Sequence, residues 1–429
     1  MLPAGAPLSD WLTWLETLSP KEIDLGLERV HAVLGRLSLN LPEQVLLIAG
    51  TNGKGSSVAM TSALLQAADY RVGAYTSPHV NAFNERIVVN GAAVTDDVIV
   101  NAFERVEQAR QSLLLTYFEF GTLAALLIFA DADLDVWILE VGLGGRLDAT
   151  NAVAPTASLI TNVSLDHCDW LGDDVETIGA EKAGVMRQGV PTVFAAAEVP
   201  RSVTRHADRC GAELLLAGRD FHHARGETGT WTWTGRNITL ENLRPPGLRG
   251  EFQFGNASAV LALVEAAGLS RVLDAELVNK VLPNVALAGR MQLVRAGGAR
   301  WLLDVAHNPA AAEKLAESLA NDAAPAPVWA IIGLLDDKDV AGIALPLNAH
   351  VDHWIAVTAD SHRAVPAPEL ARRISDCCGR PCRVSESLAA GLRYAQQHAG
   401  TSGTVLVTGS FYTVGPALRE LELYSPPRS

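Results

Sequence analysis

One stretch, LLIAGTNGKGSSVAM (Leu46–Met60), limits the possible fold more than any other part of the chain. An apolar run leads into a loop with glycines at 50, 53 and 55, and a helical pattern follows. A strand, a glycine loop and a helix in this order bind phosphate, because the loop amides and the helix N-terminus face one anion. The common loop reads G-x-x-x-x-G-K-[ST], but here Gly55 separates Lys54 from Ser56. The stretch therefore predicts a variant phosphate loop, and a glycine turn that caps a helix is the structural alternative.

Apolar runs alternate with helical patterns along the chain, which is typical of β-α units around parallel sheets. We predict strands at 44–49, 71–75, 136–141, 157–161 and 192–195, and, after the pattern restarts near residue 290, at 301–305, 328–333, 353–357 and 405–408. Helices are predicted at 57–68, 122–130, 257–267, 310–319 and 388–397, and a hairpin turns at 235–237. A chain of 429 residues exceeds one ordinary core. We expect an α/β protein: a P-loop-containing parallel-sheet ATPase domain (1–292) followed by a smaller Rossmann-like domain (293–429).

Composition narrows the class of protein. The net charge of −14 disfavours a nucleic-acid partner, which needs a basic face. The longest apolar stretch, 123–141, contains three aspartates and is not a membrane span, and the N-terminus lacks the basic start of a signal peptide. Three of the five cysteines fall in CCGRPC, which fits no standard zinc site. We expect reduced thiols in a cytoplasmic protein, with a metal or redox role as the alternative.

Polar residues follow two further apolar runs. Glu140 ends VWILE, and Asp166-His167 follows ASLITNVSL. Because ligands of open α/β sheets bind at the carboxyl ends of the strands, we expect Glu140 and His167 to share one crevice with Lys54. A carboxylate suits a hard cation beside ATP, whereas a lone histidine is more often a satisfied surface or core residue. The VGLGGR loop is a poor dinucleotide fingerprint, because Leu147 stands at the third glycine position.

Seven motifs, in order, carry a family resemblance: AGTNGKGSS, YTSPHVNAFNERI, LTYFEFGT, LEVGLGGRLDATN, LDHCDWLG, EKAGV and LDVAHNP. Together they resemble the bacterial bifunctional dihydrofolate synthase/folylpolyglutamate synthases, relatives of the Mur cell-wall ligases, from about residue 8 to about residue 420. The inserted Gly55 belongs to the phosphate loop of that family.

The resemblance implies an ATP-dependent ligase that joins L-glutamate to dihydropteroate and adds further glutamates to tetrahydrofolate, a reduced folate. A carboxylate resists attack by an amine, and phosphorylation converts it into an acyl phosphate with a good leaving group. Catalysis then consists mainly of positioning and charge neutralisation. The family also implies two Mg²⁺ ions and a monomer.

The resemblance assigns residues to the nucleotide and the metal. The implied ATP contacts are Thr51, Asn52, Gly53, Lys54, Gly55, Ser56, Asn256, Arg290, Asp304 and His307. Ser77, Glu140 and His167 would hold one Mg²⁺, and a carbamylated Lys182 would help to hold the second. Lys54, Lys182 and His307 are the implied catalytic residues. By themselves, Ser77 is a turn residue, Lys182 a solvated helix lysine and Arg290 an interdomain salt-bridge partner, and Asn308 before Pro309 is a helix cap.

A second set is implied for the organic substrates. The implied pterin-pocket residues are Ile23, Asp24, Leu25, Thr116, Tyr117, Phe118, Glu119, Leu147, Asp148 and Ala149. Two aromatic rings can sandwich a flat pterin, although Phe118 and Phe120 are core residues by default. Ser410, at the last strand's end, is the expected glutamate contact.

Three other classes of protein fit the sequence less well. A Mur ligase for a UDP-linked precursor carries an extra N-terminal domain, for which we expect no room before the loop at residue 50. A nucleotide-driven switch would turn over ATP without a carboxylate acceptor and leaves LDVAHNP unexplained. An oxidoreductase lacks its dinucleotide fingerprint.

Overall fold

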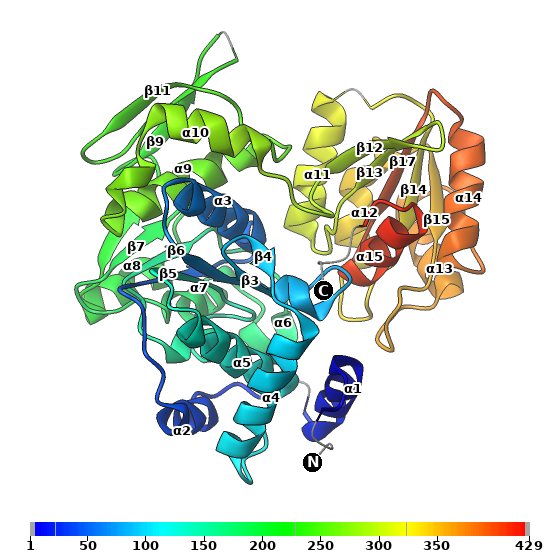
Figure 1. Ribbon diagram of the computed structural model, residues 1–429. Coiled ribbons are helices and arrows are strands. Elements are labelled where there is room, and N and C mark those ends of the chain that lie inside the picture. The colour runs from blue at the N-terminus through cyan, green and yellow to red at the C-terminus, as the bar shows by residue number, and fades with distance from the viewer. Residues whose placement is uncertain (1–4, 22, 228, 323, 425–429) are drawn as a thin grey trace.

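The computed structural model describes residues 5–21, 23–227, 229–322 and 324–424, which form two α/β domains side by side (Figure 1). The N-terminal domain contains an eight-stranded sheet in the order β4-β3-β2-β5-β1-β6-β7-β8. Its strands are β1 (Gln44–Ala49), β2 (Val72–Tyr75), β3 (Ile87–Val89), β4 (Ala92–Ala93), β5 (Val136–Glu140), β6 (Ala157–Ile160), β7 (Pro191–Phe194) and β8 (Glu213–Leu216). The six strands from β2 to β8 are parallel, while β3 and β4 add an antiparallel edge.

Both faces of this sheet are buried, which explains the continuous apolar runs. Along β1, Val45, Leu47 and Ala49 face one core, and Leu46 and Ile48 face the other. The first core lies under α1 (Leu8–Leu18), α2 (Glu28–Leu37), α4 (Asp96–Arg110), α5 (Tyr117–Asp131), α7 (Val175–Ala183) and α8 (Arg201–Cys210). The second lies under α3 (Lys54–Ala67), α9 (Phe252–Ala266), α10 (Ala275–Val281) and a small antiparallel sheet of β9 (His222–Arg225), β10 (Trp231–Thr234) and β11 (Thr239–Leu243).

The C-terminal domain is a smaller sheet sandwiched between helices. Its order is β12-β13-β17-β14-β15-β16, and only β12 is antiparallel to its neighbour. The strands are β12 (Gln292–Ala296), β13 (Ala299–Leu303), β14 (Val328–Ile332), β15 (His353–Ala356), β16 (Cys382–Val384) and β17 (Thr404–Thr408). The helices are α11 (Pro309–Asn321), α12 (Val340–Asn348) and α13 (Ala367–Cys378) on one face, and α14 (Leu388–Ala399) and α15 (Phe411–Glu420) on the other.

The predicted fold class is confirmed, and each predicted strand and helix overlaps an observed one. The expected hairpin is formed by β10 and β11. The sequence pattern missed the antiparallel strands β3, β4, β9 and β12 and the parallel edge strands β8 and β16. The second sheet begins at Gln292, but the domain limits 1–292 and 293–429 stay a prediction.

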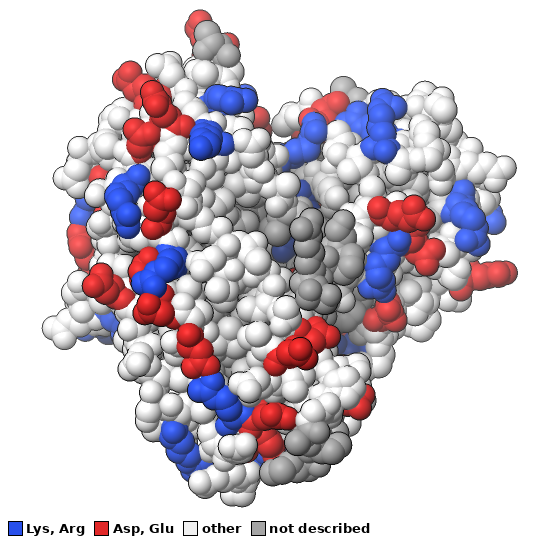
Figure 2. Space-filling model, viewed as in Figure 1, with Lys and Arg blue, Asp and Glu red and all other residues white. Residues whose placement is uncertain are grey.

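The distribution of charge and the length of the apolar helices both bear on possible partners. Figure 2 shows Lys and Arg side chains interspersed with Asp and Glu over the face in view. Across the described ranges, the structure contains no helix that is both long and apolar enough to cross a bilayer.

Candidate functional site

The phosphate loop joins β1 to α3 at the cleft between the domains. Gly53 precedes α3 with a φ of 87°, and a Cβ there would lie 3.0 Å from Asn256 Oδ1, so the position requires glycine. The next residue, Lys54, begins the helix, and its Nζ donates to the carbonyls of Gly50 (2.9 Å) and Thr51 (3.1 Å). The ammonium group is therefore held back over its own loop, where it faces any anion that the loop binds.

The end of β6 anchors this loop. Thr51 N donates to the Asn162 carbonyl (3.1 Å), and Asn52 N donates to Asn162 Oδ1 (3.0 Å). The hydroxyls of Thr51 and Thr161 donate to Ser164 O (3.1 Å) and Asn52 O (2.6 Å). The loop conformation is thus set by a neighbouring strand end as well as by its glycines.

A cavity of about 520 Å³ opens in front of the loop and is lined by both domains. It brings together every residue predicted for ATP or metal, and Ser410 as well. These lining residues are Thr51, Asn52, Gly53, Lys54, Gly55, Ser56, Ser77, Glu140, His167, Lys182, Asn256, Arg290, Asp304, His307 and Ser410. Residues far apart in sequence therefore share one site, as the strand-end argument predicted.

The N-terminal half of the cavity contains the predicted metal ligands. Glu140 is buried at the end of β5, and its Oε2 accepts from Ser77 N (3.2 Å). Burial raises the pKa of Glu140, although Lys54 and Arg290 oppose this. Burial lowers the pKa of His167 to about 4, although the Asp166 carboxylate opposes this. A hydroxyl and a carboxylate suit a hard cation beside phosphate, and the imidazole is a less usual third donor.

The other members of the cavity complete its donor set. In the described part of the chain no three His, Cys, Asp or Glu residues converge on one point, so a bound cation needs further ligands, such as a hydroxyl or phosphate. Lys182 is buried on α7, and this burial lowers its pKa to about 7, which contradicts the alternative of a solvated helix lysine. Burial also lowers the pKa of Lys54, opposed mainly by Glu140.

The segment that joins the domains contributes Arg290, and the C-terminal domain contributes Asp304, His307 and Ser410. Asp304 Oδ2 accepts from Met291 N and its Oδ1 from Ala306 N, both at 2.8 Å, so this carboxylate fixes the segment that enters the domain. The guanidinium carbon of Arg290 lies 4.9 Å from the Phe411 ring centre. Within the described ranges Arg290 forms no ion pair, so the alternative of a simple salt bridge is not supported. The Ser410 hydroxyl lies 2.9 Å from that of Thr413.

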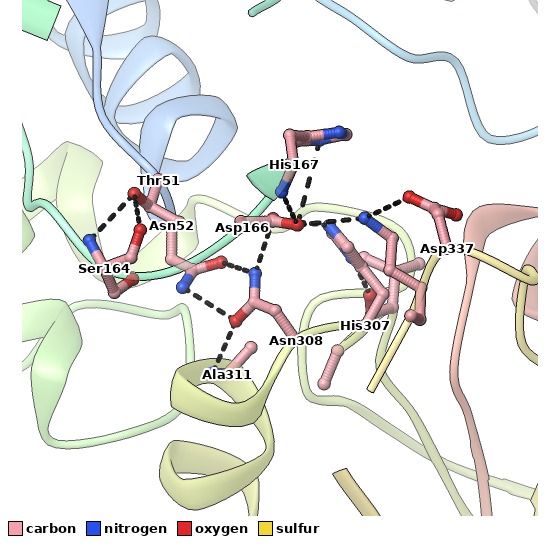
Figure 3. Close-up of polar contacts among 12 residues, drawn as sticks. Thr51, Asn52, Ser164, Asp166, His167, His307, Asn308, Ala311 and Asp337 are labelled. Carbon is pink, nitrogen blue, oxygen red and sulfur yellow. Dashed lines mark hydrogen bonds and ion pairs between the residues drawn. The ribbon is translucent and has the colours of Figure 1, made fainter. Parts of the chain in front are cut away.

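A polar cluster between the domains was largely missed from the sequence (Figure 3). Asp166, between β6 and α6 (Cys168–Leu171), accepts from Lys338 Nζ (Oδ1, 2.9 Å) and Asn308 Nδ2 (Oδ2, 2.9 Å). His307 Nε2 lies 3.6 Å from the same carboxylate. Burial alone would raise the pKa of Asp166, but His307, His167 and Lys338 hold it well below its usual range.

Asn308 has the expected capping role and a second role. Its Oδ1 accepts from Ala311 N (2.9 Å) at the start of α11. Its amide also exchanges hydrogen bonds with the Asn52 amide at 3.1 and 3.0 Å. The signals in the sequence were Asn308-Pro309 and the lysine within the acidic run DDKD, but neither reveals its partner in the other domain.

The predicted pterin-pocket residues lie outside this cavity. Asp24 and Glu119 are joined by Arg29, which pairs with Asp24 Oδ2 (2.8 Å) and Glu119 Oε1 (2.9 Å). Glu119 also caps α5 by accepting from Thr116 N (2.8 Å). Phe118 packs on Gly142, where an added Cβ would lie 2.6 Å from its ring. The structure thus brings residues 23–25 near the start of α5, and Arg29 is the member that sequence reasoning missed.

Asp148 lies buried inside its own loop. Its Oδ2 accepts from Leu143 N (2.9 Å), and its Oδ1 accepts from Thr150 N (3.0 Å) and the Thr150 hydroxyl (2.6 Å). Burial raises the pKa of Asp148, and these hydrogen bonds oppose it. The side chain shapes the loop that contains Leu147 and Ala149, and a direct substrate contact by these three residues stays a prediction.

Comparisons with known proteins agree with this architecture. Residues 48–264 match the Mur ligase middle domain, and residues 289–411 match the Mur ligase glutamate ligase domain. The dihydrofolate synthase/folylpolyglutamate synthase of Escherichia coli K12 is 39% identical over 420 residues, covering 98% of this chain and 96% of the relative. Its Haemophilus influenzae counterpart is 34% identical, covering 96% and 97%.

Solved structures are equally similar. Escherichia coli FolC in complex with DHPP and ADP has a TM-score of 0.93 at 38% identity, covering 98% of this chain and 99% of that one. A bifunctional folylpolyglutamate synthase/dihydrofolate synthase with Mn, AMPPNP and L-glutamate bound has a TM-score of 0.90 at 38% identity, covering 98% and 100%.

A phosphate-loop domain joined to a second α/β domain across a charged cavity defines an ATP-dependent ligase of the Mur type. Within that class, the chain belongs to the dihydrofolate synthase/folylpolyglutamate synthase family. The resemblance seen in the seven motifs is therefore confirmed.

Proposed function

We propose that this chain joins L-glutamate to dihydropteroate to form dihydrofolate, and adds further glutamates to tetrahydrofolate, with ATP as co-substrate. The observation that carries the proposal is the convergence of Lys54, Glu140 and His307 from three distant segments on one cavity lined by both domains. Relatives whose structures contain ADP, DHPP, AMPPNP, Mn and L-glutamate support the choice of substrates. From the family resemblance and the composition, we also propose a monomeric, cytoplasmic enzyme.

In the first step, the chain's own groups hold the phosphates and the acceptor. The loop amides and Lys54 bind the β- and γ-phosphates, and Asn256 of α9 and Arg290 of the interdomain segment contact the nucleotide. An oxygen of the acceptor carboxylate attacks the γ-phosphorus and ADP leaves, which gives an acyl phosphate. Ser77, Glu140 and His167 are the residues that would hold Mg²⁺, which neutralises phosphate charge when bound.

In the second step, the glutamate amine attacks the acyl carbon. The amine loses a proton, and inorganic phosphate departs from the tetrahedral intermediate. Ser410 and His307, at the C-terminal side of the cavity, place the amino acid and screen the reacting carbon from water. Lys182, as its carbamate, would be a further oxygen ligand for a second Mg²⁺, since carbamylation converts a buried cation into an anion.

The proposal predicts ADP release that requires both glutamate and a pterin acceptor. Labelled glutamate should enter product with dihydropteroate and with tetrahydrofolate, tested side by side with Mg²⁺. Lys54→Met should lower kcat by roughly 10²- to 10³-fold, because a preorganised charge facing the phosphates is lost. The exposed Lys280→Met is the matched control and should retain full activity.

Two results would overturn the assignment. Equal ADP release with both organic substrates absent would favour the nucleotide-driven switch. Near-normal turnover by Lys54→Met, with an unchanged circular-dichroism spectrum, would remove the phosphate loop from the mechanism.

A further inference from the structure

The Asp166 cluster joins the two domains at the edge of the cavity. Asp166 belongs to the N-terminal domain, whereas Lys338 lies just before α12 of the C-terminal domain. The side chain of Lys338 is only 7% exposed and that of Asp166 only 8%. Their 2.9 Å ion pair is therefore a buried contact across the domain interface.

This ion pair can form only when the two domains are closed. Lys338 has one other carboxylate partner among the described residues, Asp337, at 3.1 Å, and that side chain is 23% exposed. Separating the domains would remove Asp166 from Lys338 and return both charges to water. Removing one partner while the domains stay together would leave the other buried charge with fewer partners, Asp337 for Lys338 or Asn308 and His307 for Asp166, which is unfavourable. The pair therefore favours the closed arrangement only while both partners are present.

The same cluster reaches the phosphate loop. Asn308 donates to Asp166 Oδ2 and exchanges two hydrogen bonds with Asn52, a loop residue. Asn308 also caps the N-terminus of α11. These contacts fix the position of α11 relative to the phosphate loop and the Asp166 carboxylate. His307 is the residue before Asn308, so its backbone position is fixed with them.

We propose that Lys338 is a positioning residue for ligation: through Asp166 it holds the C-terminal domain against the phosphate loop and so places His307 and Ser410 opposite the bound phosphates. The expected effect on kcat rests on the proposed function, whereas the expected effect on domain closure rests on the geometry alone. Lys338 acts through Asp166 and makes no direct contribution to nucleotide affinity.

The test uses the full-length protein and two readouts. Lys338→Met keeps the length of the side chain and removes its charge, Lys338→Arg keeps the charge, and the exposed Lys280→Met is the control. We expect Lys338→Met to lower kcat roughly 10- to 100-fold, as for other residues that orient a catalytic group, while the Kd for ADP measured by calorimetry is unchanged. Small-angle scattering of the ADP-bound protein should show a larger radius of gyration. Lys338→Arg should recover most of the rate.

A double-mutant cycle tests the partner. If Lys338 acts through Asp166, Asp166→Asn with Lys338→Met should be no slower than the slower single variant. Fully additive losses, a weakened Kd for ADP in Lys338→Met, or unchanged kcat and scattering would each overturn the proposal. If the wild-type protein shows no glutamate-dependent turnover, the proposed function fails, and the scattering comparison still decides whether Lys338 controls closure.

Discussion

At the scale of single residues, the cavity is unusual in how many charged groups it removes from water. Burial lowers the pKa values of Lys54 and Arg290 and raises those of Glu140 and Asp304. Each shift has the direction expected when desolvation outweighs the nearby opposite charges. A site of this kind is prepared for a ligand that carries several charges of its own, as a nucleotide and a metal do.

Lys182 gives a pH-dependent prediction. Burial places its pKa at about 7, below the usual 10.5, so the neutral amine that can add CO₂ grows in population as pH rises through about 7. Uptake of isotope-labelled bicarbonate at Lys182 should therefore be greater at pH about 8 than at pH about 6, as measured by NMR of the carbamate. Activity should fall in CO₂-depleted buffer and return on adding bicarbonate.

The same shift has a stability consequence of defined sign. Between about 7 and 10.5 the unfolded chain binds the Lys182 proton more tightly, so the free energy of unfolding should rise with pH across this window. Lys182→Met should abolish both the label and this part of the pH dependence. Full activity without any labelled carbamate would contradict the assigned role.

At the scale of elements, two glycines of the phosphate loop have different tasks. Gly53 has a left-handed backbone and Asn256 against it, whereas a Cβ on Gly55, inside the first turn of α3, would meet only Arg290 and Glu140 at 3.8 Å. The first glycine is needed for folding of the loop. The second leaves space in the cavity where phosphate is expected, which gives a physical reason for the displaced serine.

Matched alanine variants separate these tasks. Gly53→Ala should lower the free energy of unfolding by about 1–2 kcal/mol, the cost of a left-handed non-glycine residue. Gly55→Ala should be as stable as wild type, since alanine favours a helix, but should bind ADP more weakly. Denaturant unfolding and calorimetry distinguish the two effects. Equal behaviour of the two variants in both measurements would refute this division.

The sequence predicted these central elements because burial on both faces makes their strands continuous apolar runs. It missed β3, β4, β8, β9, β12 and β16, which lie at or next to the edges of their sheets. In the site, Glu140 and His167 could be predicted, since Glu140 ends β5 and His167 lies on the loop that follows β6. The Asp166–Lys338 pair could not, because its members are 172 positions apart and neither domain's local pattern contains information about the other.

At the scale of the whole molecule, the domains touch at a second place besides the Asp166–Lys338 pair. α15 and the segment after it lie against the loop after Ser77 (Figure 1). Arg419 donates to Asn81 Oδ1, and the Tyr424 hydroxyl donates to Glu85 Oε1 (2.6 Å). Glu85 in turn accepts from the amides of the same loop. The segment that contains a predicted metal ligand is thus fixed partly by the other domain.

Gly415 tests this contact. A Cβ there would lie 2.2 Å from the Val80 carbonyl, so Gly415→Ala should push α15 away from the loop without breaking the helix. We expect a lower kcat and a larger radius of gyration by small-angle scattering. Gly35→Ala, in α2 with no atom within 4 Å of the added Cβ, is the control and should change neither quantity. Wild-type kinetics in Gly415→Ala would show that the contact between α15 and the loop after Ser77 is not needed for activity.

The connection between the domains has an evolutionary consequence. The segment entering the second sheet is held by a hydrogen bond from Met291 N to Asp304 and by one from Val305 N to the Gly289 carbonyl (2.9 Å). Arg290, which lines the cavity and is the proposed nucleotide contact, lies between these two attachments. A substitution that loosens the joint would therefore also displace a ligand contact. A substitution selected because it changes the motion of the domains should therefore also change the affinity for the ligand that Arg290 contacts. Related enzymes whose domains move differently should differ at this joint in both domain motion and ligand affinity.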